Sequence, residues 1–207
     1  MSRRLGDSVR CTAALAWTVL CLSAADASAQ SRFDVGLLLG STTATDEGTV
    51  LQFDRGTTYQ ATFAWRVWRT KAATLSIEVP FIASPAFTVV TPGASLPLEY
   101  ASLYLTPGAR VTLLPSAPIS VFGAIGAGYA RYSESRLKAD RSPNLNQRDT
   151  NADALEFGAG VEVRGFGWLG FRGELREVYT GARNFSIHTP GPRVHNVIGS
   201  GGLVVRF

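Results

Sequence analysis

Apolar and polar residues alternate with a period of two along most of the chain beyond residue 31. In one segment, Leu75, Ile77 and Val79 alternate with Ser76 and Glu78. Successive side chains of a β-strand point to opposite faces, so this period predicts strands with one apolar and one polar face. The pattern predicts eight strands, at about residues 32–43, 57–68, 73–83, 100–113, 119–133, 154–164, 169–179 and 195–207.

The connections between these predicted strands alternate strictly in length. The short ones are 69–72, 114–118 and 165–168, and the long ones are 44–56, 84–99, 134–153 and 181–194. Transmembrane barrels have short periplasmic turns and long outer loops, and strands of about ten residues are long enough to span a bilayer. A Greek-key sandwich gives no reason for the alternation. We therefore predict an all-β, eight-stranded antiparallel transmembrane barrel in an up-and-down meander, with both ends periplasmic.

The first 29 residues have the three parts of a secretory signal peptide. Arg3, Arg4 and Arg10 form a positive region, residues 11–25 are apolar, and Ala27-Ser28-Ala29 is a cleavage site. The apolar run is shorter than the roughly 20 residues of a membrane-spanning helix. We expect residues 1–29 to be removed and residues 30–207 to form one exported barrel domain.

The composition narrows the classes of function. Both cysteines, Cys11 and Cys21, lie in the predicted signal peptide, so we expect no disulfide and no cysteine metal site in the mature domain. The whole chain has 20 basic and 16 acidic residues; without the three arginines and two aspartates of the signal peptide, 17 and 14 remain. This mild positive charge gives no argument for nucleic acid. No motif predicts a cofactor.

Nearly the whole predicted mature chain resembles a known family, and four segments carry the resemblance. The segments are VFGAIGAGYARY (121–132), LEFGAGVEVR (155–164), LGFRGELREVY (169–179) and HNVIGSGGLVVRF (195–207), ending on an aromatic residue. They are similar to small Gram-negative outer-membrane barrels of the OmpA/OmpX-like class, in the "outer membrane protein beta-barrel domain" grouping. The resemblance implies location in the cell outer membrane, contact with its lipids including lipopolysaccharide, and no periplasmic domain after the last strand. It also implies that the assembly machinery recognises Leu203, Val205 and Phe207.

Ten charged residues share the parity that faces the lumen of such a barrel. They are Arg66, Glu78, Arg110, Glu156, Glu162, Arg164, Arg172, Glu174, Arg176 and Arg206. One hypothesis is an ion pathway, and the other is a network of salt bridges that plugs the lumen. The interior of an eight-stranded barrel is just wide enough for its own side chains, which favours the plug.

Aromatic residues gather near both predicted ends of the strands, as interfacial belts do. The predicted belts consist of Trp68, Phe122, Phe166, Trp168 and Phe207 at the end with the short turns and of Tyr59, Tyr100, Tyr132 and Tyr179 at the end with the long loops. Four of these residues fit a belt less well, because their parity points inward: Tyr100, Tyr132, Trp68 and Trp168. In the second long loop, Phe87, Val89 and Val90 are apolar, so this loop is expected to fold over the rim or to extend a strand.

These features favour a structural or surface-interaction role without enzymatic activity. In the third long loop, Lys138, Arg141 and Arg148 are candidates for binding lipopolysaccharide phosphates or a host or phage partner. The alternative is a flexible, hydrated loop without a ligand. Three alternatives stay open: a narrow porin-like channel, a lipid-modifying enzyme that uses His188 or His195 with Ser186, and a soluble secreted barrel. We expect no catalytic, cofactor or metal site.

Overall fold

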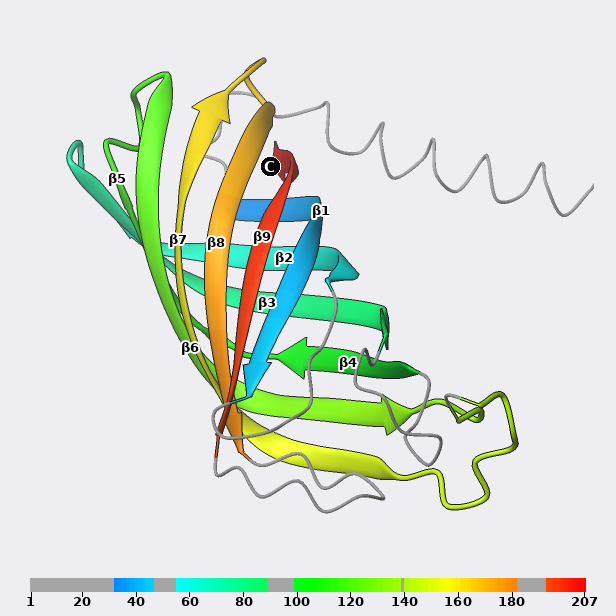
Figure 1. Ribbon diagram of the computed structural model, residues 1–207. Helices are drawn as coiled ribbons and strands as arrows, with labels where there is room; N and C mark the ends of the chain where they lie inside the picture. Colours follow the sequence, from blue (N-terminus) through cyan, green and yellow to red (C-terminus); the bar gives the residue numbers. More distant parts are fainter. Residues whose placement is uncertain (1–31, 47–54, 89–98, 139, 182–192) are drawn as a thin grey trace, which may run out of the picture.

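The computed structural model describes residues 32–46, 55–88, 99–138, 140–181 and 193–207. The predicted signal peptide and its cleavage site lie outside these residues, as do Val89, Val90, Ser186 and His188. The strands are β1 (Phe33–Asp46), β2 (Gly56–Arg69), β3 (Ala73–Thr88), β4 (Glu99–Leu105), β5 (Gly108–Leu113), β6 (Ile119–Glu134), β7 (Asp149–Arg164), β8 (Leu169–Gly181) and β9 (Arg193–Arg206). Figure 1 shows their arrangement.

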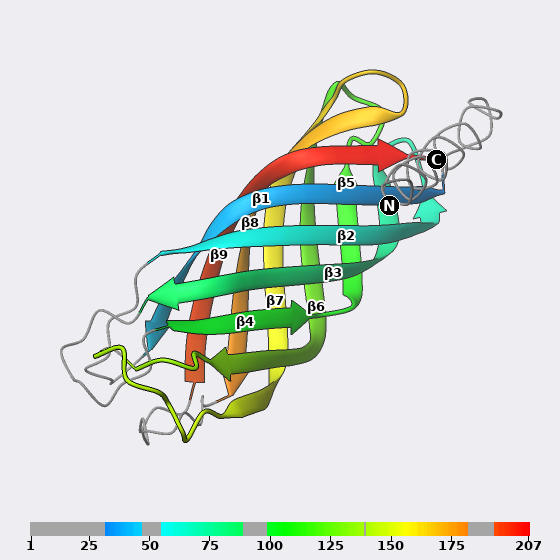
Figure 2. The same cartoon turned by 90° about the vertical axis from the view of Figure 1, so that its right-hand side faces the viewer.

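All neighbouring strands are antiparallel, and the sheet closes on itself because β9 pairs with β1. The strands β4 and β5 together cross the barrel once, since both lie between β3 and β6 and Pro107 interrupts them. Proline has no backbone N–H to donate to the neighbouring strand, so the strand is interrupted at this position. The register with β3 is the same on both sides of the break. The predicted eight-stranded barrel in meander order is thereby confirmed (Figure 2).

The two faces of the closed sheet differ as the alternation predicts. Leu37, Leu39 and Leu175 lie on the outer surface with more than half of their area exposed, whereas Glu78, Glu156 and Arg176 on the inner face are almost fully buried. A soluble barrel would place its apolar side chains inside. The apolar outer surface is that of a barrel whose surroundings are lipid. No helix in the described part of the chain is long and apolar enough to cross a membrane.

Two β-bulges change which face a residue occupies. In β2 the register shifts between Arg66 and Trp68, so that Trp68 lies outside and Arg69 turns toward the lumen mouth. In β3 the register shifts between Ser84 and Phe87, which places Phe87 inside. A bulge inserts one extra residue, and strict alternation beyond it is lost.

The burial of the aromatic residues corrects the predicted belts. Trp68 and Trp168 are exposed, although their parity points inward, while Tyr100 and Tyr132 are buried in the lumen and belong to no belt. Phe122, which is predicted in the belt at the short-turn end, also lies inside. Tyr100, Tyr132 and Phe122 lie inside as their parity indicates. The bulge before Trp68 and the turn that contains Trp168 place these two residues outside against their parity.

The strands are longer than predicted at the ends that carry the long loops. β7 begins at Asp149 rather than at residue 154, and β3 continues to Thr88. The second long loop therefore contributes a strand extension, and its Phe87 packs inside the barrel. We call this end of the barrel the long-loop end and the opposite one the short-turn end.

Candidate functional site: the barrel lumen

The centre of the lumen is a network of ion pairs around Arg176. The guanidinium of Arg176 donates to Glu78 on β3, to Glu156 on β7 and to Glu174 on β8, and all four side chains are buried. Thr106 donates to Glu156, and Gln60 donates to Glu174. Buried charges are tolerated when they are paired and hydrogen-bonded, and the carboxylates of this layer meet that condition.

Two further buried arginines carry the network toward the short-turn end. Arg110 Nη1 lies 2.8 Å from Glu78 Oε2, and Arg110 Nη2 donates to Asp34 Oδ2 over 2.7 Å. Arg172 Nη2 donates to Glu162 Oε2 over 2.8 Å. The guanidinium carbons of Arg110 and Arg172 lie 5.6 and 5.1 Å from the centre of the Phe122 ring, within the range of cation–π contacts.

The long-loop end of the lumen is filled by aromatic and hydroxyl groups. The rings of Phe87 and Tyr100 stack with centroids 4.8 Å apart, and Tyr104 meets Tyr132 edge to face at 6.0 Å. The Tyr132 hydroxyl lies 2.8 Å from Thr180 Oγ1. This layer contains fewer charged side chains than the centre, and it lies between the centre and the long loops.

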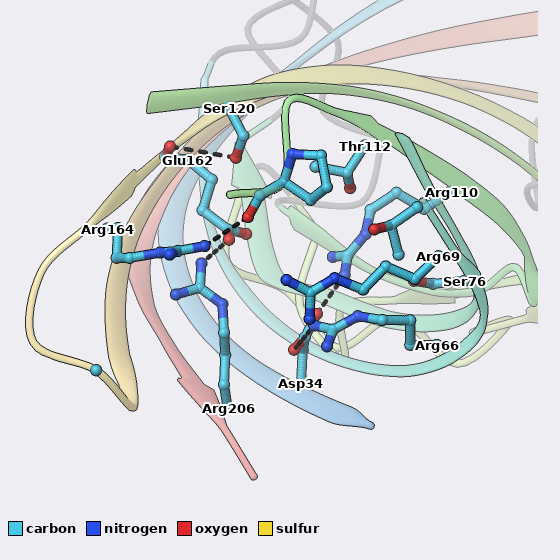
Figure 3. Close-up of a pocket in the computed structure, with 13 residues that line it drawn as sticks. Asp34, Arg66, Arg69, Ser76, Arg110, Thr112, Ser120, Glu162, Arg164 and Arg206 are labelled. Carbon is cyan, nitrogen blue, oxygen red and sulfur yellow. Dashed lines mark hydrogen bonds and ion pairs between the residues drawn. The ribbon is translucent and has the colours of Figure 1, made fainter. Parts of the chain in front are cut away.

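The short-turn end contains a pocket of about 170 Å³ (Figure 3). Five arginines and two carboxylates line it, namely Arg66, Arg69, Arg110, Arg164, Arg206, Asp34 and Glu162. Arg66 Nη2 donates to Asp34 Oδ1 over 3.3 Å, and Arg206 donates to Glu162. Arg69 and Arg164 are exposed at the rim and donate to Ser116 Oγ and to the Pro115 carbonyl.

The structure places the ten predicted lumen charges on the inner side of the sheet, but not in one environment. Arg176, Arg172 and Arg110 and the four glutamates are buried, Arg66 and Arg206 are half-buried, and Arg164 lies exposed at the mouth. Asp34 is absent from the predicted set, although it links Arg66 to Arg110. Its position between the outward-facing Phe33 and Val35 is the signal that assigns it to the inner face.

Two residues of the predicted assembly signal, Leu203 and Val205, lie on the outer side of β9, and Phe207 follows its last residue. Val205 pairs with Val35 on β1 and with Leu169 on β8, and Leu203 pairs with Leu37 and Phe171. Phe207 exchanges backbone hydrogen bonds with Phe33. This strand thus closes the barrel by joining the last part of the chain to the first strand.

One of the two histidines is described. His195 lies on the outer side of β9 near the long-loop end, with Nδ1 3.2 Å from Glu177 Oε1 and its ring against Tyr179. Within the described ranges, no group of three histidine, cysteine, aspartate or glutamate side chains is placed to hold a metal ion.

Searches with protein families and with curated proteins found no match. Solved structures do match. Neisserial surface protein A aligns with a TM-score of 0.60 and 12% identity, over 84% of this chain and 97% of the other. Ail, the attachment invasion locus protein of Yersinia pestis, aligns with a TM-score of 0.52 and 9% identity, over 85% and 99%. With its closed meander, apolar exterior and filled polar lumen, the chain has the fold of the small eight-stranded outer-membrane β-barrels.

Proposed function

We propose that this chain resides in the outer membrane as a non-conducting barrel and acts through contacts that its long loops make at the cell surface. One observation carries the proposal: the lumen is filled across its width by Arg176 and its three carboxylates. Ions need a continuous path of water to cross a barrel, whereas the polar groups of this layer are bonded to one another. We infer that such a protein acts through its outer surfaces.

The third long loop, residues 135–148, is the surface that supports this role best. It folds back on itself through a bridge between Leu137 and Pro143, and its Asn144 is buried. Asn144 Nδ2 donates to the Ser135 carbonyl over 3.2 Å, and the Arg136 carbonyl accepts from Asn144 N over 2.8 Å. Figure 1 shows this loop reaching beyond β6 and β7.

The loop presents positive charge together with one exposed apolar side chain. Arg141 and Arg148 are exposed, Lys138 is half-buried, and Leu145 is 91% exposed. Guanidinium and ammonium groups bind phosphates, and lipopolysaccharide is the phosphate-bearing lipid of the outer leaflet. We infer that lipopolysaccharide phosphates are the partner of this loop. The proposal assigns no catalytic role to His195.

Conductance measurements test the closed lumen. Residues 30–207 are refolded and inserted into a planar lipid bilayer under voltage. We expect no stepwise current, because the ion pairs of the lumen close its cross-section. Steady conductance that changes in Arg66→Gln or Glu78→Gln would establish the channel alternative in place of this proposal.

Binding of purified lipopolysaccharide to the detergent-folded barrel tests the loop. The variant Lys138→Gln/Arg141→Gln/Arg148→Gln is expected to bind about fivefold more weakly for each cation removed, corresponding to about 1 kcal/mol per charge. Arg131→Gln serves as the matched control, because Arg131 is exposed on β6 outside the loop and paired with Asp149. Equal affinity of the triple variant and the control would rule out this partner for the loop.

A further inference from the structure

We propose that the arginine-lined pocket at the short-turn end binds a small phosphate-type oxyanion. The pocket lies at the opposite end from the long loops, and the proposal is independent of whether the lumen conducts. Its lining comes from strands far apart in the sequence. Figure 3 shows Arg164 and Arg206 on one side of the pocket, facing Arg66, Arg69 and Arg110 on the other.

The charges that line the pocket do not balance. Its five arginines exceed its two carboxylates by three charges, of which Glu78, outside the lining, offsets one through its pair with Arg110. Both carboxylates are already engaged, Asp34 with Arg66 and Arg110, and Glu162 with Arg172 and Arg206. Gathering like charges in a partly enclosed space is unfavourable unless a counter-charge enters. An anion supplies that counter-charge.

Hydrogen-bond donors around the pocket also lack partners. Among the described residues, Arg110 Nε, Arg206 Nη1 and Thr74 Oγ1 are buried side-chain atoms without a hydrogen-bond partner. All three residues line the pocket, and Arg110 is only 2% exposed. Buried donors are nearly always paired in folded proteins, so a group that accepts hydrogen bonds is expected here. Donors and excess positive charge together specify an anion that accepts several bonds.

The chemistry of the lining favours a phosphate group, and the volume of about 170 Å³ leaves room for one. Guanidinium groups match phosphate oxygens with paired donors, which makes arginine the usual residue for such recognition. The bulge in β2 turns Arg69 toward the pocket. The irregular pairing of this strand therefore supplies the fifth arginine of the lining.

The phosphate has two potential sources, a free ion or the headgroup of a phospholipid. Isothermal titration calorimetry of the full folded barrel in a neutral detergent and a phosphate-free buffer distinguishes them. One arm uses inorganic phosphate, and the other uses a short-chain phosphatidylglycerol. The test variant is Arg69→Gln/Arg164→Gln, because both side chains are exposed at the rim and take no part in the buried ion pairs. The control is Arg131→Gln on the outer part of β6.

We expect saturable binding in at least one arm that the double variant weakens by about tenfold or more, equivalent to about 1.4 kcal/mol. The control should bind as the unmodified chain does. Binding of inorganic phosphate identifies a free ion as the ligand, and binding of the lipid alone identifies a headgroup. Absence of binding in both arms, or equal binding by the double variant and the control, would overturn the proposal. Heat-dependent mobility on a gel verifies that each variant is folded.

Discussion

At the residue scale, Arg176 is the side chain on which the ion pairs of the lumen converge. It joins β3, β7 and β8 through Glu78, Glu156 and Glu174. Removing two charges from water costs several kcal/mol per ion, and pairing at good geometry offsets most of that cost. The network therefore adds little net stability over an apolar filling, but removing one partner is expensive because the remaining charges stay buried.

The variant Arg176→Leu tests this asymmetry. It leaves three buried carboxylates without their main cation, so we expect the free energy of unfolding to fall by about 3–5 kcal/mol. Urea titration of the barrel in lipid vesicles, followed by tryptophan fluorescence, measures the decrease. Arg131→Leu is the control, since it removes an exposed pair with Asp149 and is expected to cost about 0–1 kcal/mol.

A second substitution separates charge from packing. If uncompensated charge causes the decrease, neutralising two of the partners in Arg176→Leu/Glu156→Gln/Glu174→Gln should restore part of the stability. If this triple variant is no more stable than Arg176→Leu, the packing of the arginine stem, and not its charge, dominates.

At the scale of elements, this barrel departs from regular strand pairing near the ends of its strands. The bulge in β2 presents Arg69 to the pocket, and the bulge in β3 inserts Phe87 against Tyr100. The third long loop is likewise an ordered element. Its turn is held by Asp140, whose Oδ1 accepts hydrogen bonds from the backbone N–H of Ser142 over 2.9 Å and from its hydroxyl over 2.6 Å.

The turn at Asp140 is expected to depend on pH. The hydrogen bonds from the Ser142 hydroxyl and amide lower the pKa of Asp140 below its ordinary range. A depressed carboxyl pKa stabilises the turn above the unfolded value, about pH 4, and the effect disappears as the pH falls through the lower folded value. NMR should show the Ser142 amide resonance moving on acidification below about pH 4. The movement should be absent in Asp140→Asn, and an unchanged resonance in the unmodified chain would contradict the assignment.

At the scale of the whole molecule, the lumen is divided into three layers of different chemistry. An arginine-rich pocket opens at the short-turn end, ion pairs fill the centre, and stacked aromatic rings with hydroxyl groups fill the long-loop end. The outer surface carries exposed apolar side chains, among them Leu37, Phe63 and Leu175. The two ends of the barrel therefore differ. Binding of a phosphate-type anion is proposed in the pocket at the short-turn end and on the third long loop at the other end.

The assignment of most residues to the inner or outer face was predictable from the sequence, because the alternation sets it. Alternation places Glu78, Glu156 and Arg176 on one face and Leu37 and Leu175 on the other, and closure into a barrel makes the first face interior. Asp34 follows the same rule, although it is absent from the predicted set. Trp68 and Phe87 do not follow from the pattern in this way, since the bulges before them are set by pairing across strands.

The sequence by itself determined the strand count, the meander and the polarity of the two faces, because a period of two is a local property of each segment. The tertiary structure decided the partners. Glu78 and Arg176 are 98 residues apart in the sequence, and only the register of the closed sheet brings them together. The same holds for the pocket. Arg69, Arg164 and Arg206 become neighbours because closure joins the ends of β2, β7 and β9 around one mouth.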